Sequence, residues 1–245
     1  MADILEQLAE KLKQALGAEL VSVILYGSAA SGDRQEKFSD YNVLCVLNRL
    51  TPRELAATET VFRWWNAQGN PAPLLLTAQE VASSTDCFAI EFHDIKESHR
   101  LLYGADVVSA LTVENTYYRA QVERELRAKL LRVRQKASAI LSDNAALRQL
   151  LADSVSTFCV LFRHALILHG EKAPVKKREI IARAKERFGL DAAPFLSLLD
   201  LREQKVKAKE MEPGAVLAAY LTEIGKVIDA VDALEKTDAR EGVRN

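Results

Sequence analysis

Two short segments hold the residues best suited to chemistry. The first is Gly27-Ser28, which directly follows the apolar run 21–26, and the second is Ser39-Asp40-Tyr41-Asn42, which precedes the apolar run 43–47. Glycine has no Cβ and lets the backbone approach a phosphate group closely, while a serine hydroxyl and the backbone amides at a helix start can bind phosphate oxygens. Side chains spaced two apart, such as Asp40 and Asn42, point to the same side of a strand. The pattern predicts a phosphate-binding turn beside a carboxylate of the kind that binds Mg²⁺.

Strands and one helix are expected to position these segments. The runs 21–26 and 41–47 are rich in β-branched and aromatic residues and predict two buried strands, joined by a polar loop with one helical turn. A helix with a threonine N-cap and a proline at its first position is expected over 51–68. Residues 73–77 predict a third strand. The segment 88–103 fits a helix followed by a short apolar stretch.

Beyond about residue 112 the pattern becomes helical throughout. Apolar residues recur at helical spacing in four segments, 122–140, 145–169, 174–189 and 217–234. The sequence thus predicts an α/β (α+β) domain with a small mixed sheet over residues 1–111, followed by an all-α helical bundle over residues 112–245.

The stretch Leu25–Gly32, followed by Phe38–Val46, resembles the signature of the polymerase-β-like nucleotidyltransferase superfamily. That signature has a strand, Gly-Ser, a loop, and Ser-Asp-x-Asp at the head of the next strand. The resemblance implies that the paired acids, with a third acid on a neighbouring strand, hold magnesium ions while an oxygen attacks the α-phosphorus of a nucleoside triphosphate. By architecture, the helical remainder is similar to the C-terminal bundle of the aminoglycoside (kanamycin) nucleotidyltransferases.

The chain departs from this signature at two of the three acid positions. Asp40 matches the first acid, but Asn42 stands at the second. In the aminoglycoside group the third strand reads roughly Pro-Leu-Glu-Val-Thr, and its alignment with Pro73–Thr77 puts Leu75 at the third acid. An amide oxygen is a weak, neutral metal ligand and leucine is none. The comparison implies a site that keeps its phosphate loop and Asp40 but lacks the charge to hold two Mg²⁺ ions.

Three nearby charged residues are further candidates for the same site. Arg34 and Lys37 follow the signature turn and could contact phosphates, or be solvated loop charges. Glu91 lies among apolar residues and is the candidate replacement acid and metal ligand. The alternative for Glu91 is a partly exposed helix position, or a carboxylate paired with Lys96 or Arg100.

Composition narrows the class of protein. The 245 residues carry a formal net charge of −1, so the global charge predicts no nucleic-acid partner. No run approaches the roughly 20 apolar residues of a membrane span, so no membrane partner is expected. Cys45, Cys87 and Cys159 each lie in an apolar run, which predicts reduced core thiols and a cytoplasmic protein.

The leading interpretation is a catalytically impaired or inactive nucleotidyltransferase-fold protein, a pseudoenzyme, that binds a nucleotide or another phosphorylated small molecule at Gly27 and Ser28. One alternative is an active nucleotidyltransferase that uses Mg²⁺ and a nucleoside triphosphate and transfers a nucleotidyl group to a small-molecule acceptor. Another is a non-catalytic interaction module, such as an antitoxin-like partner. The sequence leaves open the ligand, the acceptor and whether the chain forms a homo-oligomer.

Overall fold

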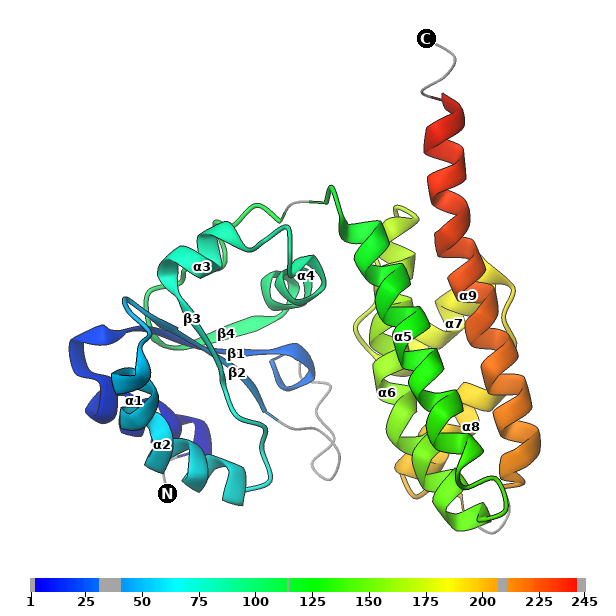
Figure 1. Cartoon of the computed structure of the whole chain (residues 1–245), viewed down its shortest axis with the longest axis horizontal. Coiled ribbons are helices and arrows are strands. Elements are labelled where there is room, and N and C mark those ends of the chain that lie inside the picture. Colours follow the sequence, from blue (N-terminus) through cyan, green and yellow to red (C-terminus); the bar gives the residue numbers. More distant parts are fainter. Residues whose placement is uncertain (1–2, 31–40, 114, 207–210, 242–245) are drawn as a thin grey trace. The chain divides into compact units, whose positions relative to one another are not determined.

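The computed structural model describes residues 3–30, 41–113, 115–206 and 211–241, with the side chains of Ser28 and of residues 235–241 excepted. The chain divides into two compact units, Met1–Tyr118 and Arg119–Asn245. Figure 1 shows the elements of each unit.

The first unit is built on a four-stranded mixed sheet. Its strands are β1 (Leu20–Tyr26), β2 (Asn42–Leu47), β3 (Leu74–Thr77) and β4 (His99–Gly104). Their order is β3-β2-β1-β4; β1 is antiparallel to β2 and to β4, and β2 is parallel to β3. Its helical elements are α1 (Ile4–Leu16), η1 (Gly17–Glu19), η2 (Gly27–Ala29), α2 (Pro52–Ala67), α3 (Ala78–Ser83) and α4 (Ala89–Glu97).

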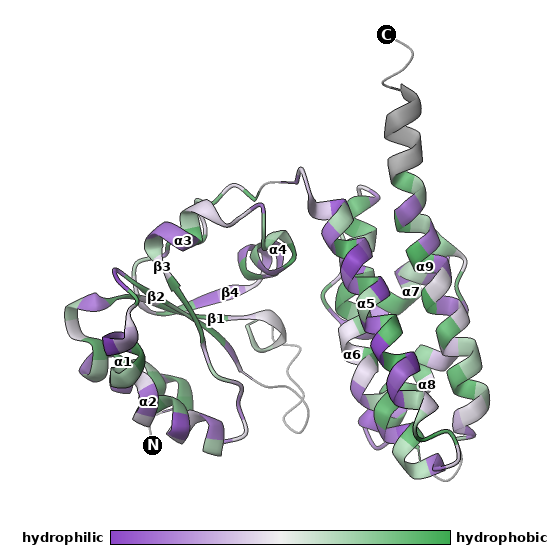
Figure 2. Cartoon of the chain, in the orientation of Figure 1, coloured by the Kyte–Doolittle hydropathy of each residue, from purple (hydrophilic) through white to green (hydrophobic). Residues whose placement is uncertain are grey.

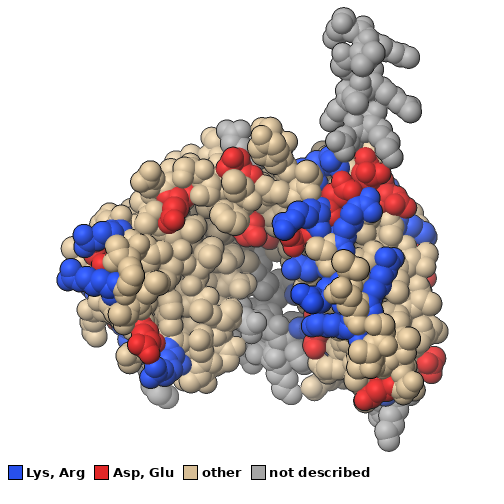
Figure 3. Space-filling view, viewed as in Figure 1, with Lys and Arg blue, Asp and Glu red and all other residues tan. Residues whose placement is uncertain are grey.

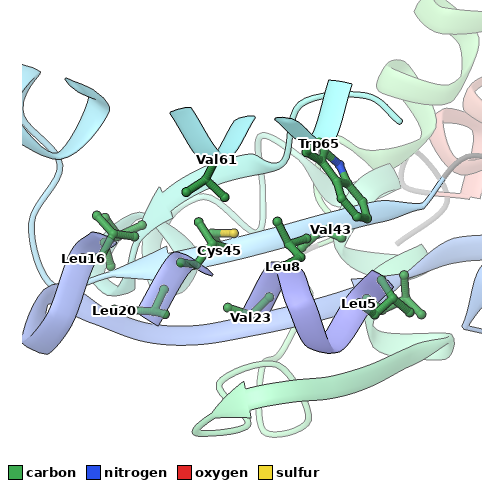
Figure 4. Packing of buried hydrophobic residues seen from close by; sticks show 12 residues of the cluster. Leu5, Leu8, Leu16, Leu20, Val23, Val43, Cys45, Val61 and Trp65 are labelled. Atoms are coloured by element: carbon green, nitrogen blue, oxygen red, sulfur yellow. The ribbon is translucent and has the colours of Figure 1, made fainter. Parts of the chain in front are cut away.

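Helices cover both faces of this sheet. Helices α1 and α2 lie on one face, over a core that includes Cys45 and Trp65 (Figure 4). Helices α3 and α4 lie on the other face, over a core that includes Leu44 and Phe92 (Figure 1). Because both faces are buried, β1 and β2 are apolar almost without alternation (Figure 2).

The start of α2 shows how local sequence sets a boundary. Thr51 is the N-cap: its Oγ1 accepts from the N–H of Arg53 at 3.3 Å, and its own N–H donates to Oε2 of Glu54 at 2.9 Å. Pro52 occupies the first helical position, where no intrahelical N–H bond is lost. The predicted helix start is confirmed.

The second unit contains only helices in the part that the structure describes. They are α5 (Tyr118–Ser138), α6 (Asn144–Leu168), α7 (Lys177–Phe188), α8 (Ala193–Arg202) and α9 (Pro213–Glu241). The rings of Phe162 and Phe195 lie 5.2 Å apart, and Tyr220 lies 5.0 Å from Phe195 and 5.6 Å from Phe158, all typical aromatic contacts. The predicted fold class, an α/β unit with a small mixed sheet followed by a helical bundle, is confirmed.

Two expectations about apolar segments need correction. Cys45 and Cys159 are buried, and burial raises the pKa of each thiol to about 12, but Cys87 is exposed in the turn between α3 and α4. Contrary to the sequence expectation, α6 is long and apolar enough to cross a membrane by length and composition. However, 61% of its most apolar 18-residue stretch is buried inside the protein.

Candidate functional site

The turn after β1 brings the backbone of Gly27 beside the start of β2. Gly27 opens η2 with a φ of +76°, a left-handed conformation that favours glycine. Its N–H donates to the carbonyl of Ser98 at 3.2 Å, and its carbonyl accepts from the N–H of Ala30 at 2.9 Å. A Cβ at this position would lie 3.3 Å from Nδ2 of Asn42. A side chain here would therefore strain the backbone and crowd Asn42.

Three polar side chains form a row across the sheet next to this turn. Asn42 on β2 and His99 on β4 are the cross-strand partners of Tyr26, the last residue of β1. Directly opposed residues of neighbouring strands point to the same face. Since Tyr26 packs against the core under α3 and α4, all three residues belong to that face. Asn42, Tyr26 and His99 are called the polar row below.

Helix α4 brings two carboxylates toward the middle of the polar row. Burial raises the pKa of Tyr26, and the negative charges of Glu91 and Asp94 raise it further. Glu91 lies in the first turn of α4 and is exposed. The pairing of Glu91 with Lys96 or Arg100 that the sequence suggested is absent from the described residues, where Lys96 donates to a backbone carbonyl instead. Glu91 thus presents a carboxylate that neither of these cations neutralises, near the Asn42 face.

His99, at one end of the polar row, is contacted by the loop that follows β4. Its Nε2 lies 3.5 Å from Oδ2 of Asp106 and 3.4 Å from Oγ of Ser109. The side chain of Ser109 donates to the Asp106 carboxylate, and this bond is the largest cause that holds the pKa of Asp106 well below its usual range. A carboxylate beside Nε2 favours the proton on that nitrogen and leaves Nδ1 as an acceptor. Nδ1 is buried without a hydrogen-bond partner among the described residues.

The register of β3 places Leu75 on the sheet face opposite to Asn42. Leu75 is the Cα partner of Cys45 and packs with it against the core under α1 and α2. Leu74 is the partner of Leu44, which shares a face with Asn42 because the two are spaced two apart on β2. Leu75 therefore points away from Asn42, and Leu74 is the first residue of β3 on the Asn42 face. Leucine at either position supplies no metal ligand.

The remaining predicted residues lie outside what is described. These are Arg34, Lys37, Asp40 and the side chain of Ser28. Among the described residues, no three or more His, Cys, Asp or Glu side chains are arranged to hold a metal ion. On the face next to Gly27, Asn42 offers one neutral amide oxygen and β3 offers only leucine. The side chains described on these two strands do not fit a two-metal cluster.

Sequence reasoning missed the contributions of Tyr26, His99 and Asp106. From the sequence, residues 99–104 are expected only as a short apolar stretch after a helix. No turn signal precedes this stretch, so the sequence does not indicate that a strand begins there. The signal that could have found them is pairing: a strand over 99–104 antiparallel to β1 places His99 opposite Tyr26.

Comparison with known proteins supports the fold. No protein-family model matches the chain, and no curated protein sequence matches it. Among solved structures, it is similar to spectinomycin adenyltransferase AAD(9) from Enterococcus faecialis, whose crystal structure contains ATP and spectinomycin. The TM-score is 0.60 at 13% identity, and the match covers 94% of this chain and 98% of that one. The chain therefore shares the fold of this adenyltransferase, which agrees with the nucleotidyltransferase fold expected from the sequence.

Proposed function

We propose that this protein is a nucleotidyltransferase-fold pseudoenzyme that binds a nucleotide at the Gly27 turn and does not transfer it. The observation that carries the proposal is the pairing of the Gly27 turn with neutral side chains at two of the three acid positions. Gly27 keeps a positive φ and stands against Asn42, while β3 offers leucine on both faces. Nucleotide binding is supported by the ATP-containing neighbour of the same fold.

A calorimetric titration tests this proposal with a non-hydrolysable ATP analogue, with and without magnesium. Because Asn42 and Leu74 hold no ion, we expect an affinity that magnesium changes by less than about tenfold, or about 1.4 kcal/mol. Gly27→Val should weaken binding by at least about tenfold, since a β-branched side chain blocks close backbone approach. Gly69→Val is the matched control, because Gly69 also has a positive φ but lies in open space.

The two variants must first be shown to fold. Both tryptophans, Trp64 and Trp65, lie on α2 in the first unit, so their fluorescence reports the melting of that unit alone. An analogue that fails to bind the parent, or that binds Gly27→Val as tightly as Gly69→Val, would overturn the proposal. Binding that requires magnesium would show that the metal site is retained.

One observation favours the active enzyme as a second candidate. The charges of Glu91 and Asp94 reach Tyr26, which lies between Asn42 and His99 in the polar row. An active enzyme would use Asp40 and Glu91 to hold magnesium. Pyrophosphate release from ATP, with spectinomycin among the acceptors because the neighbour binds it, tests this candidate. Turnover that Glu91→Gln abolishes would replace our leading proposal.

The location, the domain bounds and the interaction-module role expected from the sequence remain proposals. The burial of most of the apolar stretch of α6 supports a cytoplasmic location, and the expected domain division at residue 111 lies seven residues before the division into units after Tyr118. An interaction-module role would be tested by co-purification of the chain with a stable partner.

A further inference from the structure

Helix α5 carries a concentration of positive charge that the net charge of the chain conceals. Its 21 residues include seven Lys or Arg and only two Glu. Figure 3 shows basic side chains gathered over this part of the second unit, and Figure 2 shows the hydrophilic positions along the same helix. Four of these cations, Arg124, Lys129, Arg132 and Lys136, are exposed and lie within about 140° of one another around the helix at 100° per residue, and they are called the basic face of α5 below.

Both acids of α5 are already engaged within its first half. Glu123 accepts from Arg119 at 2.7 Å and from Arg127 at 2.6 Å. Glu125 lies 3.3 Å from Arg124 and 3.5 Å from Lys129. The second half of the helix therefore has no acid of its own to neutralise it.

Three cations of that second half, Arg132, Arg134 and Lys136, form no ion pair in the part of the chain that the structure describes. Cations near a helix C-terminus interact favourably with the helix dipole, which accounts for Lys136 in the last turn. It does not account for Arg132, which is placed four residues before Lys136. Like charges at this spacing destabilise a helix by about 0.2–0.5 kcal/mol. The like charges therefore lower the stability of the helix, and folding alone does not explain why they are present.

We infer that the basic face of α5 binds the phosphodiester backbone of a nucleic acid, a property separate from nucleotide binding at Gly27. At 1.5 Å per residue, Arg124 and Lys136 are about 18 Å apart along the helix, which matches about five phosphates of one strand at 3.4 Å spacing. A single triphosphate is too short to contact cations over that length. A lipid surface needs a broad apolar face, whereas Leu131 is the exposed large apolar residue among these cations.

Fluorescence anisotropy with labelled duplex DNA, duplex RNA and single-stranded RNA tests the inference on the full chain. We expect binding that weakens steeply between 50 and 200 mM salt, because bound counterions are released. The triple variant Lys129→Gln, Arg132→Gln, Lys136→Gln should lower affinity by at least about tenfold. It should also reduce the slope of log affinity against log salt by about 0.9 for each duplex-DNA phosphate that the variant no longer neutralises.

A second triple variant removes the same charge elsewhere in the second unit. Arg183→Gln, Lys185→Gln and Arg187→Gln lie on α7, where Arg183 and Arg187 pair with Glu171. This control should bind nucleic acid like the parent, and both variants should bind the ATP analogue like the parent. Absence of nucleic-acid binding at 50 mM salt, an equal loss in both variants, or tighter binding to anionic vesicles or to an acidic polypeptide would overturn the inference.

Discussion

Asn42 and Leu75 lie on opposite faces of the same sheet, although sequence alignment alone assigns both to one catalytic cluster. Leu75 pairs with Cys45 in the parallel β2–β3 ladder and packs under α1 and α2. Asn42 pairs with Tyr26 and faces α4. A carboxylate meant to approach Asn42 from β3 therefore belongs at Leu74.

This relationship predicts which double substitution can rebuild a metal site. Asn42→Asp with Leu74→Glu should place two new carboxylates on the face to which the signature assigns Asp40. We expect a melting temperature that is below the parent value without magnesium, because like charges repel, and that rises with magnesium, because the ion binds only the folded cluster. Thermal melting followed by tryptophan fluorescence at increasing magnesium concentrations measures these melting temperatures.

The matched control is Asn42→Asp with Leu75→Glu, which has the same composition and charge. Its glutamate enters the core under α1 and α2, where an unpaired charge is costly. We expect a lower melting temperature that magnesium does not restore. Equal responses of the two double variants to magnesium would show that the faces are wrongly assigned.

Glu91→Gln should lower the pKa of Tyr26 toward the ordinary tyrosine value without reaching it. Burial is the largest cause of the raised pKa and remains, whereas the charge of Glu91 is removed. The ¹³Cζ shift of tyrosine followed against pH, with Tyr26→Phe for assignment, measures the change. Glu97→Gln, on the last residue of the same helix, is the control and should leave the titration of Tyr26 as it is in the parent.

Asp106→Asn should make the protein less sensitive to acid. The pKa of Asp106 is lower in the fold than in the unfolded chain, so its charged form stabilises the fold above the unfolded value of about 3.9. That stability is lost as the pH falls below this value. Asparagine can keep the oxygen that accepts from the N–H groups of Val108 and Ser109 but does not titrate.

Urea unfolding at pH 5 and pH 3 checks this expectation. The parent should lose more free energy of unfolding between the two pH values than Asp106→Asn does. Ser109→Ala should fall between them, because it removes the largest cause of the lowered pKa. Equal losses in all three proteins would contradict the assigned role of the loop.

Gly104→Ala should destabilise the first unit more than Gly69→Ala does. Both glycines have a positive φ, which costs an L-residue about 1–2 kcal/mol. Only at Gly104 would the new Cβ run into the backbone carbonyl of Val21, while Gly69 has open space. Overpacking of this kind adds about 1–3 kcal/mol. Urea unfolding followed by tryptophan fluorescence should show the difference, and equal costs would contradict the close approach.

The sequence predicts features that local patterns determine. The N-cap of α2 follows from Thr51 and Pro52, and the buried stripe of α6 follows from helical spacing. Prediction from the sequence fails where the sheet face of a residue depends on which residue of the neighbouring strand it pairs with. A one-residue change of register moves every side chain of a strand to the other face, so Leu75 could not be placed without knowing that its partner is Cys45. Cys87 was predicted to be a buried core thiol, but it is exposed because it follows α3 in a turn rather than lying in a core element.

The central position of β1 has a consequence for how the protein is made. Its antiparallel neighbour β2 follows it closely in the chain, but the strand on its other side begins only at His99. While the chain is being synthesised, the second edge of an apolar strand stays open until β4 has emerged from the ribosome. Unpaired strand edges are templates for aggregation. A fragment that stops before His99 should therefore aggregate, and one that extends past Gly104 should not.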